Sequence, residues 1–563
     1  MKGTAILAAL ILSVSVSANA ASPKISHDTP MRGAGLVDVI VQFKHAPNGS
    51  HAQKIAAHGG VLKTDLSLVK ALHVALPANR IQELVNDPEV TYISPNRRLT
   101  PTGSTISFDV PSPAVNAPYA WSTGATGAGI GVAVIDSGTQ DAADLQNSSG
   151  KNRVVYKQSY ITGNTGTVDV YGHGIHVAGL IAGNGKSSNG QYEGAAPAVN
   201  VLNFRVLDDK GMGQDSYVIN AIQAVIDLKT TYNIRVINLS LGRPVYESYK
   251  ADPLCRAVEQ AWEAGIVVVV AAGNDGRDDS AGTNGYGTIT APGNDPYAIT
   301  VGAMKQMGTA SRSDDLIASY SSKGPTAIDH IAKPDIVAPG NRVISLLGKS
   351  ATSLQHANPQ NQVNKAYFVL SGTSMAAAVV SGSVADILQA YPSLTPDQVK
   401  AILMKSASKT FPQYSTTVDP ATSISYVSQY DVFTIGAGYL DLQAALSMAA
   451  APPPSGASMV SPVVTYDSNS GNVYFVADSS SLWGNSAMWG SSAMWGSSAL
   501  WGSNAFVGTQ SALWGSSALW GSSAMWGSST TSAFSALWGS SALWGSSSST
   551  STESLSVTIN GED

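Results

Sequence analysis

The chain has 563 residues, only 12% of them charged, and a formal net charge of −6. This length exceeds the size of a domain with a single hydrophobic core, so we expect two or more folded units. The sparse and slightly acidic charge excludes a nucleic-acid-binding surface as the main role of the protein.

The first residues have the pattern of an export signal. Lys2 is followed by an apolar run from Ala5 to Val16 and by small residues at Ala18 and Ala20. This pattern predicts a signal peptide over residues 1–20. No later run of about 18 apolar residues follows, so we expect no membrane span. The protein is therefore predicted to be secreted and extracellular.

Residues 21–100 predict a small α+β (ferredoxin-like) domain. Alternating and amphipathic patterns place strands at 37–44, 69–76 and 90–93, and helices at 51–58 and 79–86. An unrelated small binding domain is the alternative interpretation of this segment.

Residues 101–120 are predicted to form an exposed connector. Prolines interrupt regular structure there, at Pro101, Pro111, Pro113 and Pro118. An exposed linker is where chain cleavage is tolerated. We therefore expect maturation by a cut within this connector.

Hydrophobic strands alternate with helical segments across residues 121–449. Strands are expected at 131–136, 199–207, 236–241 and 266–272, and helices at 217–231, 253–264, 375–390 and 395–406. Continuous apolar strands between helices are typical of a parallel sheet covered on both faces. We predict an α/β three-layer sandwich with a mainly parallel sheet, and a site at the carboxyl ends of the strands, where Asp136 and Asn274 would lie.

The single cysteine, Cys255, cannot form an internal disulfide. It lies in the helical pattern at 253–264, which favours an inert thiol in the core over a nucleophile. Core burial must then stabilise an exported fold without disulfides.

The composition changes after residue 449. Residues 450–482 are predicted as a linker, residues 483–545 repeat Trp-Gly-Ser-Ser-Ala mostly with a period of six, and residues 546–563 form a further tail. Because six is a multiple of the strand period, an extended chain would place the tryptophans on one face. A stacked strand array and an unstructured Ser/Gly-rich tail are equal alternatives. Surface attachment or polymer binding is a further hypothesis for this repeat.

Three motifs carry side chains suited to nucleophilic catalysis. A β-prone run, the turn at Gly372 and a helix-forming series place Ser374 at a helix N-terminus, where free N–H groups and the helix dipole favour negative charge. A serine nucleophile needs a base. Of nine histidines, His173 opens a helix after a glycine turn. Asp136 ends a buried strand and would orient the His173 ring.

The same motifs carry a family resemblance. The chain has Val-Ala-Val-Ile-Asp-Ser-Gly at 132–138, Gly-His-Gly-Ile-His-Val-Ala-Gly at 172–179 and Gly-Thr-Ser-Met-Ala at 372–376. With the order Asp, His, Ser, it resembles the subtilisin-like serine proteases over roughly residues 37–449. The resemblance implies that Ser374 attacks, that His173 is the general base and then the acid, and that Asp136 orients His173.

Asn274 follows a run of valines. By the resemblance, its side-chain amide and the backbone N–H of Ser374 stabilise the oxyanion of acyl transfer. As bare sequence, Gly-Asn-Asp-Gly is only a turn signal. His176, one helical turn after His173, is interpreted as a packed helix residue, since no nearby Cys or Glu completes a zinc site.

The resemblance also implies an inhibitor and a substrate site. Residues 21–100 are similar to propeptides that assist folding and occupy the active-site cleft, so this domain is expected to be an intramolecular inhibitor. The substrate-pairing edge and the specificity pocket are expected at Gly211, Gly213, Ser240, Leu241, Gly242, Ala272 and Gly273. Glycines there permit close approach of a substrate strand, although each could equally be structural.

The chain departs from the family pattern at several positions. Residues 377–379 are Ala-Ala-Val where relatives usually have Thr-Pro-His, and Ile175 replaces the usual threonine. Alanine propagates a helix well, so we expect catalysis to survive. The resemblance implies no required cofactor. A structural calcium ion is an open alternative, because Asp144 aligns with one ligand while the loop 184–193 differs from the calcium-binding loop.

These observations predict a secreted, self-processing serine endopeptidase that acts on proteins or peptides. A catalytically weak relative that works in adhesion through its repeat tail is a second class. An esterase or lipase is disfavoured, because Ser374 does not lie in a Gly-x-Ser-x-Gly motif.

Overall fold

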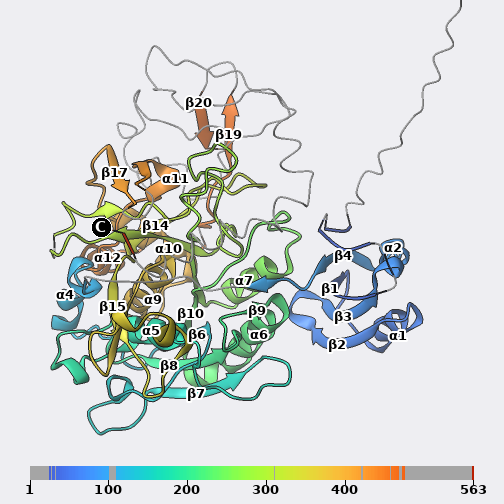
Figure 1. The fold of residues 1–563 in the computed structure, drawn as a ribbon, viewed down its shortest axis with the longest axis horizontal. Coiled ribbons are helices and arrows are strands. Elements are labelled where there is room, and N and C mark those ends of the chain that lie inside the picture. The colour runs from blue at the N-terminus through green and yellow to red at the C-terminus, as the bar shows by residue number, and fades with distance from the viewer. Residues whose placement is uncertain are drawn as a thin grey trace, which may run out of the picture.

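The computed structural model describes residues 24–26, 28–31, 33, 35–99, 109–309, 311–419, 423–456, 458–467, 472–475 and 561–562. A small N-terminal unit lies beside a large body (Figure 1). The predicted signal peptide and the Trp-Gly repeat lie outside the described residues. Among the described residues, no helix is long and apolar enough to cross a membrane.

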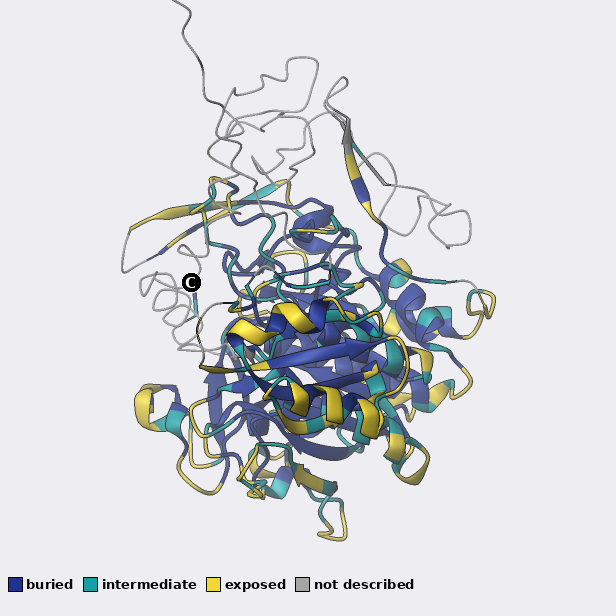
Figure 2. Cartoon of the chain, turned by 90° about the vertical axis from the view of Figure 1, so that its right-hand side faces the viewer, coloured by how far each residue is buried: buried dark blue, intermediate teal, exposed yellow. Residues whose placement is uncertain are grey.

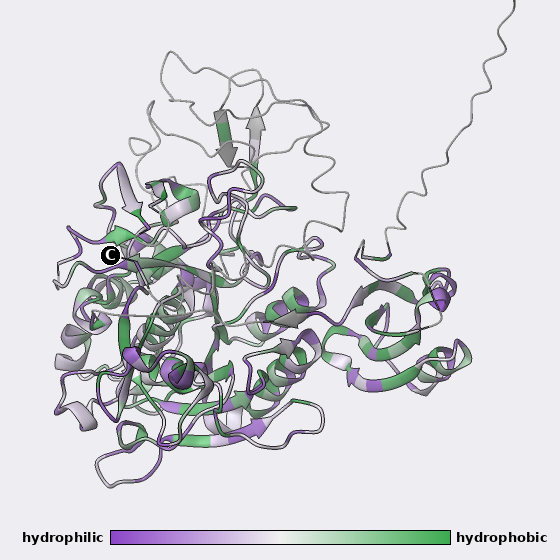
Figure 3. Cartoon of the chain, in the orientation of Figure 1, coloured by the Kyte–Doolittle hydropathy of each residue, from purple (hydrophilic) through white to green (hydrophobic). Residues whose placement is uncertain are grey.

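The small unit has the βαββαβ order of a ferredoxin-like domain. Its elements are β1 (Leu36–Phe43), α1 (Gly49–Ala57), β2 (Val61–Leu66), η1 (Ser67–Val69), β3 (Ala71–Pro77), η2 (Ala78–Arg80), α2 (Ile81–Val85) and β4 (Val90–Pro95). The antiparallel sheet has the order β2-β3-β1-β4. Figure 3 shows hydrophobic residues along these strands. The sequence pattern missed β2, because this edge strand leaves Val61 and Leu62 exposed and so lacks an apolar face.

The body is built on one twisted sheet. Its strands are β6 (Gly131–Asp136), β7 (Val154–Ser159), β8 (Asn200–Arg205), β10 (Ile234–Leu239), β11 (Val267–Ala271), β12 (Ile299–Lys305), β13 (Leu316–Ile317) and β14 (Ile336–Pro339). The order is β13-β12-β11-β10-β6-β8-β7, with β14 also pairing with β12. Every pair is parallel except β12 with β13. The predicted mainly parallel sheet is therefore present.

Helices cover both faces of this sheet. The helices α5 (His173–Ala182) and α9 (Thr373–Ala390) pack on one face, and α6 (Asp215–Tyr232) and α7 (Pro253–Glu263) pack on the other. The remaining helices of the body are α3 (Pro111–Ala114), α4 (Ala117–Ser122), α8 (Ser353–Ala357), α10 (Pro396–Ser406), α11 (Val432–Ile435) and α12 (Leu442–Ala449), with 3-10 turns η3 (Ala143–Leu145), η4 (Lys186–Ser188) and η5 (Pro359–Asn361). Two-stranded pairs complete it: β5 (Arg98–Leu99) with β9 (Gly213–Gln214), β15 (Val343–Leu346) with β16 (Tyr367–Leu370), β17 (Tyr414–Val418) with β18 (Ser425–Gln429), and β19 (Val464–Asp467) with β20 (Asn472–Phe475).

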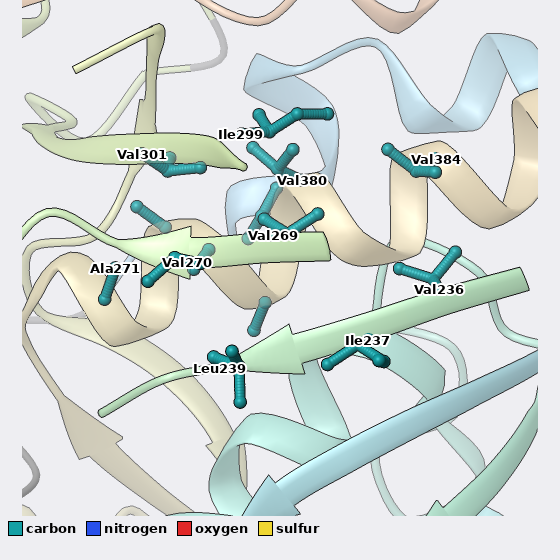
Figure 4. Packing of buried hydrophobic residues seen from close by; sticks show 14 of the residues in the cluster. Val236, Ile237, Leu239, Val269, Val270, Ala271, Ile299, Val301, Val380 and Val384 are labelled. Atoms are coloured by element: carbon teal, nitrogen blue, oxygen red, sulfur yellow. The ribbon is translucent and has the colours of Figure 1, made fainter. Parts of the chain in front are cut away.

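The central helix α9 packs against the middle of the sheet. Figure 4 shows Val380 and Val384 of α9 beside side chains of β10, β11 and β12. All of the labelled side chains are buried. Burying a valine or isoleucine stabilises the fold by roughly 1.5–3 kcal/mol. This packing fixes the helix that carries Ser374 against β11, which precedes Asn274, and α9 also contacts β6, which ends at Asp136. Figure 2 shows the same buried centre beneath helices whose outer faces are exposed.

The two predicted linkers are shorter than expected. Residues 111–122 form α3 and α4, whose side chains at Ala117 and Ala120 are buried. Prolines stand in the first turn of both helices, where a missing N–H costs nothing, so they begin helices here instead of breaking them. Likewise Met459 and Ser461 of the predicted linker 450–482 are buried in the body. Residues 101–108 of the predicted connector, and residue 100 before it, lie outside the described residues.

The small unit and the body share a hydrophobic contact. Ile40, Leu66, Val69 and Ala71 belong to the same buried cluster as the core of the body. The turn η1 packs against α7 and β2 against α6. Strand β2 and the turn η1 therefore rest on the outer helices of the body, and β1 and β3 each add a residue to the shared cluster.

Candidate active site

Strand β6 delivers Asp136 to the carboxyl edge of the sheet. The strand is buried along its whole length, between β10 and β8, as its apolar run predicts. The Nδ1 atom of His173 lies 2.8 Å from Oδ1 of Asp136. The backbone N–H of Ser137 donates to the same oxygen at 2.7 Å. This pair of contacts sets the His173 ring so that its other nitrogen, Nε2, faces away from Asp136.

His173 is the first residue of α5, and a second carboxylate fixes this helix start. The backbone N–H groups of Gly172 and Ile175 donate to the two oxygens of Asp169 at 2.7 and 2.8 Å. The Ser137 hydroxyl donates to Asp169 at 2.9 Å and accepts from Gly174 N at the same distance. Burial raises the pKa of Asp169, and the two backbone donors oppose the shift. Asp169 is a positioning residue that the sequence pattern did not reveal.

Ser374 lies in the first turn of α9. Gly372, at the N-cap, has a φ of +139°, a value that favours glycine, and donates its N–H to Gly340 O at 2.7 Å. The Ser374 hydroxyl donates to Ser240 O at 3.1 Å, and the Ser240 hydroxyl donates to Ser374 O at 2.8 Å. The helices α5 and α9 pack against each other, and Nε2 of His173 is buried with no hydrogen-bond partner among the described residues. This nitrogen is therefore available to accept a proton.

Asn274 follows β11 at the same edge. Its Oδ1 accepts from Thr373 N at 2.9 Å and from Thr373 Oγ1 at 3.0 Å. The two donors determine which end of the amide faces Thr373, so Nδ2 points away from them. That Nδ2 atom is buried and has no hydrogen-bond partner in the described part of the chain. A buried, pre-oriented N–H donor next to Thr373, the residue before Ser374, is the kind of group that could stabilise a developing oxyanion.

The predicted substrate edge is occupied by the chain itself. Gly213 lies in β9, and β5 pairs with it antiparallel, with Leu99 opposite Gly213 and Arg98 opposite Gln214. Gly211 stands in the preceding turn with a φ of +75°. An extended segment that follows the small unit thus takes the place where a substrate strand was expected.

The other predicted pocket residues have different surroundings. Ser240 contacts Ser374 directly, Leu241 and Ala272 are buried, and Gly242 and Gly273 approach neighbouring side chains closely. A Cβ on Gly242 would lie 2.6 Å from Thr290 Oγ1, and one on Gly273 would lie 2.8 Å from Ser322 Oγ. Both glycines are therefore required by packing.

Two residues considered for other roles are buried in the core. His176 lies with Nε2 3.1 Å from Phe368 O, and burial chiefly lowers its pKa to about 3, so the ring stays neutral. Burial raises the pKa of the Cys255 thiol well above its ordinary value. Both are structural side chains, as predicted.

The surroundings of Asp144 do not fit a calcium ion. Its Oδ1 accepts from the backbone N–H of Ser187 at 2.8 Å and from the Ser187 hydroxyl, and its Oδ2 accepts from the Tyr367 hydroxyl at 2.5 Å. The buried guanidinium of Arg153 donates to three nearby carbonyl oxygens, those of Asp144, Ala182 and Val199, at 2.5–2.8 Å. The carboxylate oxygens of Asp144 and these three carbonyl oxygens already accept hydrogen bonds, so they are not arranged as ligands of a hard cation. Across the described residues, no group of three His, Cys, Asp or Glu side chains could bind a metal.

Arg153→Met is expected to lower the free energy of unfolding by about 3 kcal/mol, because buried carbonyl oxygens lose their donors. Thermal unfolding of the variant and of Lys151→Met, an exposed neighbour, would measure the difference. A chelator should leave the unfolding temperature of the unmodified chain unchanged. A fall of several degrees on chelation would instead show that an ion binds this loop.

The fold, with Asp136 and His173 in contact at the carboxyl edge of its sheet, is that of a serine hydrolase. Residues 127–427, more than half of the chain, match the model of the subtilase family. The chain belongs to the subtilase family of serine endopeptidases.

Curated relatives and a solved structure are similar to this chain. Serine protease AprX of Bacillus subtilis is 40% identical over 293 residues, which are 50% of this chain and 62% of that protein. Subtilisin E of the same species is 32% identical over 374 residues, which are 65% of this chain and 84% of that protein. The crystal structure of fervidolysin from Fervidobacterium pennivorans, a keratinolytic enzyme related to subtilisin, has a TM-score of 0.58 and 22% identity, covering 80% of this chain and 66% of fervidolysin. The last likeness shows the fold.

Proposed function

We propose that the chain is a secreted endopeptidase that hydrolyses peptide bonds through Asp136, His173 and Ser374 and is made as a self-processing zymogen. The observation that carries this proposal is the pair of buried nitrogens at the carboxyl edge, His173 Nε2 and Asn274 Nδ2, both without partners among the described residues. In this proposal His173 Nε2 accepts a proton and Asn274 Nδ2 donates to an oxyanion.

The chemistry follows from these positions. Ser374 Oγ attacks the peptide carbonyl carbon while its proton passes to His173 Nε2, and Asp136 stabilises the imidazolium that forms. The carbonyl oxygen gains the negative charge and accepts a hydrogen bond from Asn274 Nδ2. When the tetrahedral intermediate collapses, the C–N bond breaks and His173 gives its proton to the leaving amine. Water then attacks the acyl-enzyme by the same route and releases the acid and Ser374.

The zymogen part of the proposal is supported by the contacts of residues 96–99. Asn96 Nδ2 donates to Gln214 Oε1 at 2.9 Å, and Asp215 N donates to Arg97 O at 2.9 Å. The Arg97 guanidinium is buried and paired with both oxygens of Glu247. With β5 bound along β9, the small unit ends in a strand that blocks the substrate edge. We propose that residues 21–100 are the inhibitor and that cleavage follows this strand.

Expression of the full chain tests this function. We expect loss of roughly the first hundred residues by intact mass, digestion of casein, and inhibition of both by a serine-directed sulfonyl fluoride that adds its mass to the peptide containing Ser374. A chain that stays full length and does not digest casein over a range of pH would contradict the proposal.

Asn274→Asp isolates the oxyanion donor. Aspartate retains an oxygen for Thr373 N but replaces Nδ2 by an acceptor, so the variant should fold and lose about 10²–10³ in kcat, the size of the effect found for this donor in subtilisin itself. Asn284→Asp, on an exposed loop, is the control. Steady-state hydrolysis of a peptide anilide would show the loss in kcat with little change in KM. Equal kcat values for the two variants would remove Asn274 from the mechanism.

A further inference from the structure

Gly561 and Glu562 of the tail contact the body, although a long stretch of sequence separates them from β20. Glu562 is only 1% exposed. Figure 1 places the C label beside β14 and β17. Residues 483–545 contain no Asp, Glu, Lys or Arg, so Glu562 is one of the few charged residues in this part of the chain. A carboxylate from a nearly uncharged tail has thus entered the peptidase body.

The Glu562 carboxylate is bound by donors on three separate segments of the body. The backbone N–H of Ser319 donates to Oε1 at 2.8 Å, and the Ser319 hydroxyl donates to Oε2. Arg277 Nη2 donates to Oε2 at 2.8 Å, and Lys305 Nζ lies 3.6 Å from Oε1. Charge-assisted bonds of this kind are the strong ones in proteins.

The backbone of the dipeptide is recognised as well. Asn341 Nδ2 donates to Glu562 O at 2.9 Å, and Glu562 N donates to Asn341 Oδ1 at 3.2 Å. Gly561 has a φ of +61°, and a Cβ there would lie 2.6 Å from Arg342 Cγ and 2.9 Å from Ser371 Oγ. The site therefore selects a glycine followed by a carboxylate, by shape and by charge.

The charges of this site require an anion. Arg277, Lys305 and Arg342 supply positive charge, and Arg277 Nη1 also donates to Asp419 Oδ2 at 2.6 Å. Burial lowers the pKa of Lys305, while Glu562 opposes that shift. Without Glu562, Asp419 would still face Arg277 and Asp109 would still lie near Arg342, but the group would lose the carboxylate that faces both Arg277 and Lys305. Buried cations that lose a counter-charge are strongly destabilising.

The same site adjoins the catalytic loops. Gly276, two residues after Asn274, donates its N–H to Tyr320 O at 2.8 Å, and Arg277 Nε donates to Ser319 Oγ at 2.7 Å. Asn341 follows Gly340, whose carbonyl accepts from the N-cap of α9. Glu562 thus connects the loop that carries Asn274 to the segments that carry Ser319 and Asn341.

We propose that Arg277, Lys305, Ser319 and Asn341 form a carboxylate-binding pocket whose ligand is Glu562 of the chain's own tail, and that its occupation fastens the tail to the peptidase body and fixes the loop that carries Asn274. The pocket lies apart from the Asp136–His173 pair. It is a receptor for one chemical group, a carboxylate that follows a glycine.

The test uses the full chain in a Ser374→Ala background, which prevents self-digestion and makes the outcome independent of peptidase activity. Glu562→Ala removes the ligand and Gly561→Val blocks its entry. We expect both to lower Tm by at least about 5 °C and to speed amide hydrogen exchange in residues 273–277. Glu553→Gln, which changes another carboxylate of the tail, is the matched control and should change neither.

Chemical rescue distinguishes a carboxylate receptor from a contact that only adds stability. Sodium acetate should raise Tm of the Glu562→Ala variant more than sodium chloride of equal ionic strength, and should leave the background protein with no such difference. If Glu562→Ala and Gly561→Val have the same Tm as Glu553→Gln, the proposed fastening of the tail to the body is wrong. Equal effects of acetate and chloride would overturn the carboxylate pocket, and unchanged exchange in residues 273–277 would overturn the link to the Asn274 loop.

Discussion

Ser374→Ala is expected to leave the chain uncut and to lower peptide hydrolysis by about 10⁶-fold, the loss known for the nucleophile of subtilisin itself. The hydroxyl lies in the first turn of α9 and donates to Ser240 O at 3.1 Å. Alanine keeps the helix, and the loss of one such bond costs about 1 kcal/mol of stability. The fold should therefore survive while the reaction does not.

The measurement for Ser374→Ala compares intact mass over time with casein hydrolysis. Ser383→Ala is a matched control, because Ser383 is a buried serine of the same helix that donates to Val379 O at 3.0 Å. It lies about two and a half turns further on. We expect the control to mature and to digest casein at the unmodified rate. If the purified Ser374→Ala chain still loses its N-terminal segment, another side chain of this protein or another protease makes the cut.

The parts of the site that could be predicted are those set by local sequence. A continuous run of valines predicts a buried strand, and the polar residue that ends it must lie at the edge of the sheet, which places Asp136 and Asn274. A glycine followed by a small-residue helix places Ser374. These features need only the strand and helix periods, and the structure has β6, β11 and α9 close to the predicted bounds.

The residues that could not be predicted act through tertiary contacts. Asp169 caps α5 and binds Ser137, yet its sequence neighbours are those of an ordinary loop. Arg153 reaches carbonyl oxygens on three different segments. Glu562 meets partners more than two hundred residues away in sequence, Ser319 and Asn341 among them. No periodicity reports such pairings, because they depend on how the elements are brought together.

Asp136→Asn is expected to slow maturation about 10⁴-fold with the fold intact. Oδ1 of Asp136 accepts from both Ser137 N and His173 Nδ1, so an amide oxygen can take its place without loss of either bond. The negative charge is then missing when His173 becomes an imidazolium. If the side-chain amide of the variant rotates instead, its N–H group faces Nδ1 of His173. The ring proton must then lie on Nε2 of His173, the nitrogen that must act as base. Both arrangements disable proton transfer from Ser374.

The rate at which the mature mass appears measures this effect, since self-cleavage is a single turnover that needs no added substrate. Asp141→Asn is the control, because Asp141 lies on the same segment after β6 but is exposed. Its Oδ1 lies 3.5 Å from Lys157 Nζ, and a surface ion pair of this kind contributes little to stability. The control should mature at the unmodified rate. Maturation of Asp136→Asn within tenfold of the unmodified chain would show that orientation of His173 by an uncharged acceptor is sufficient, and the charge of Asp136 would then have no place in the mechanism.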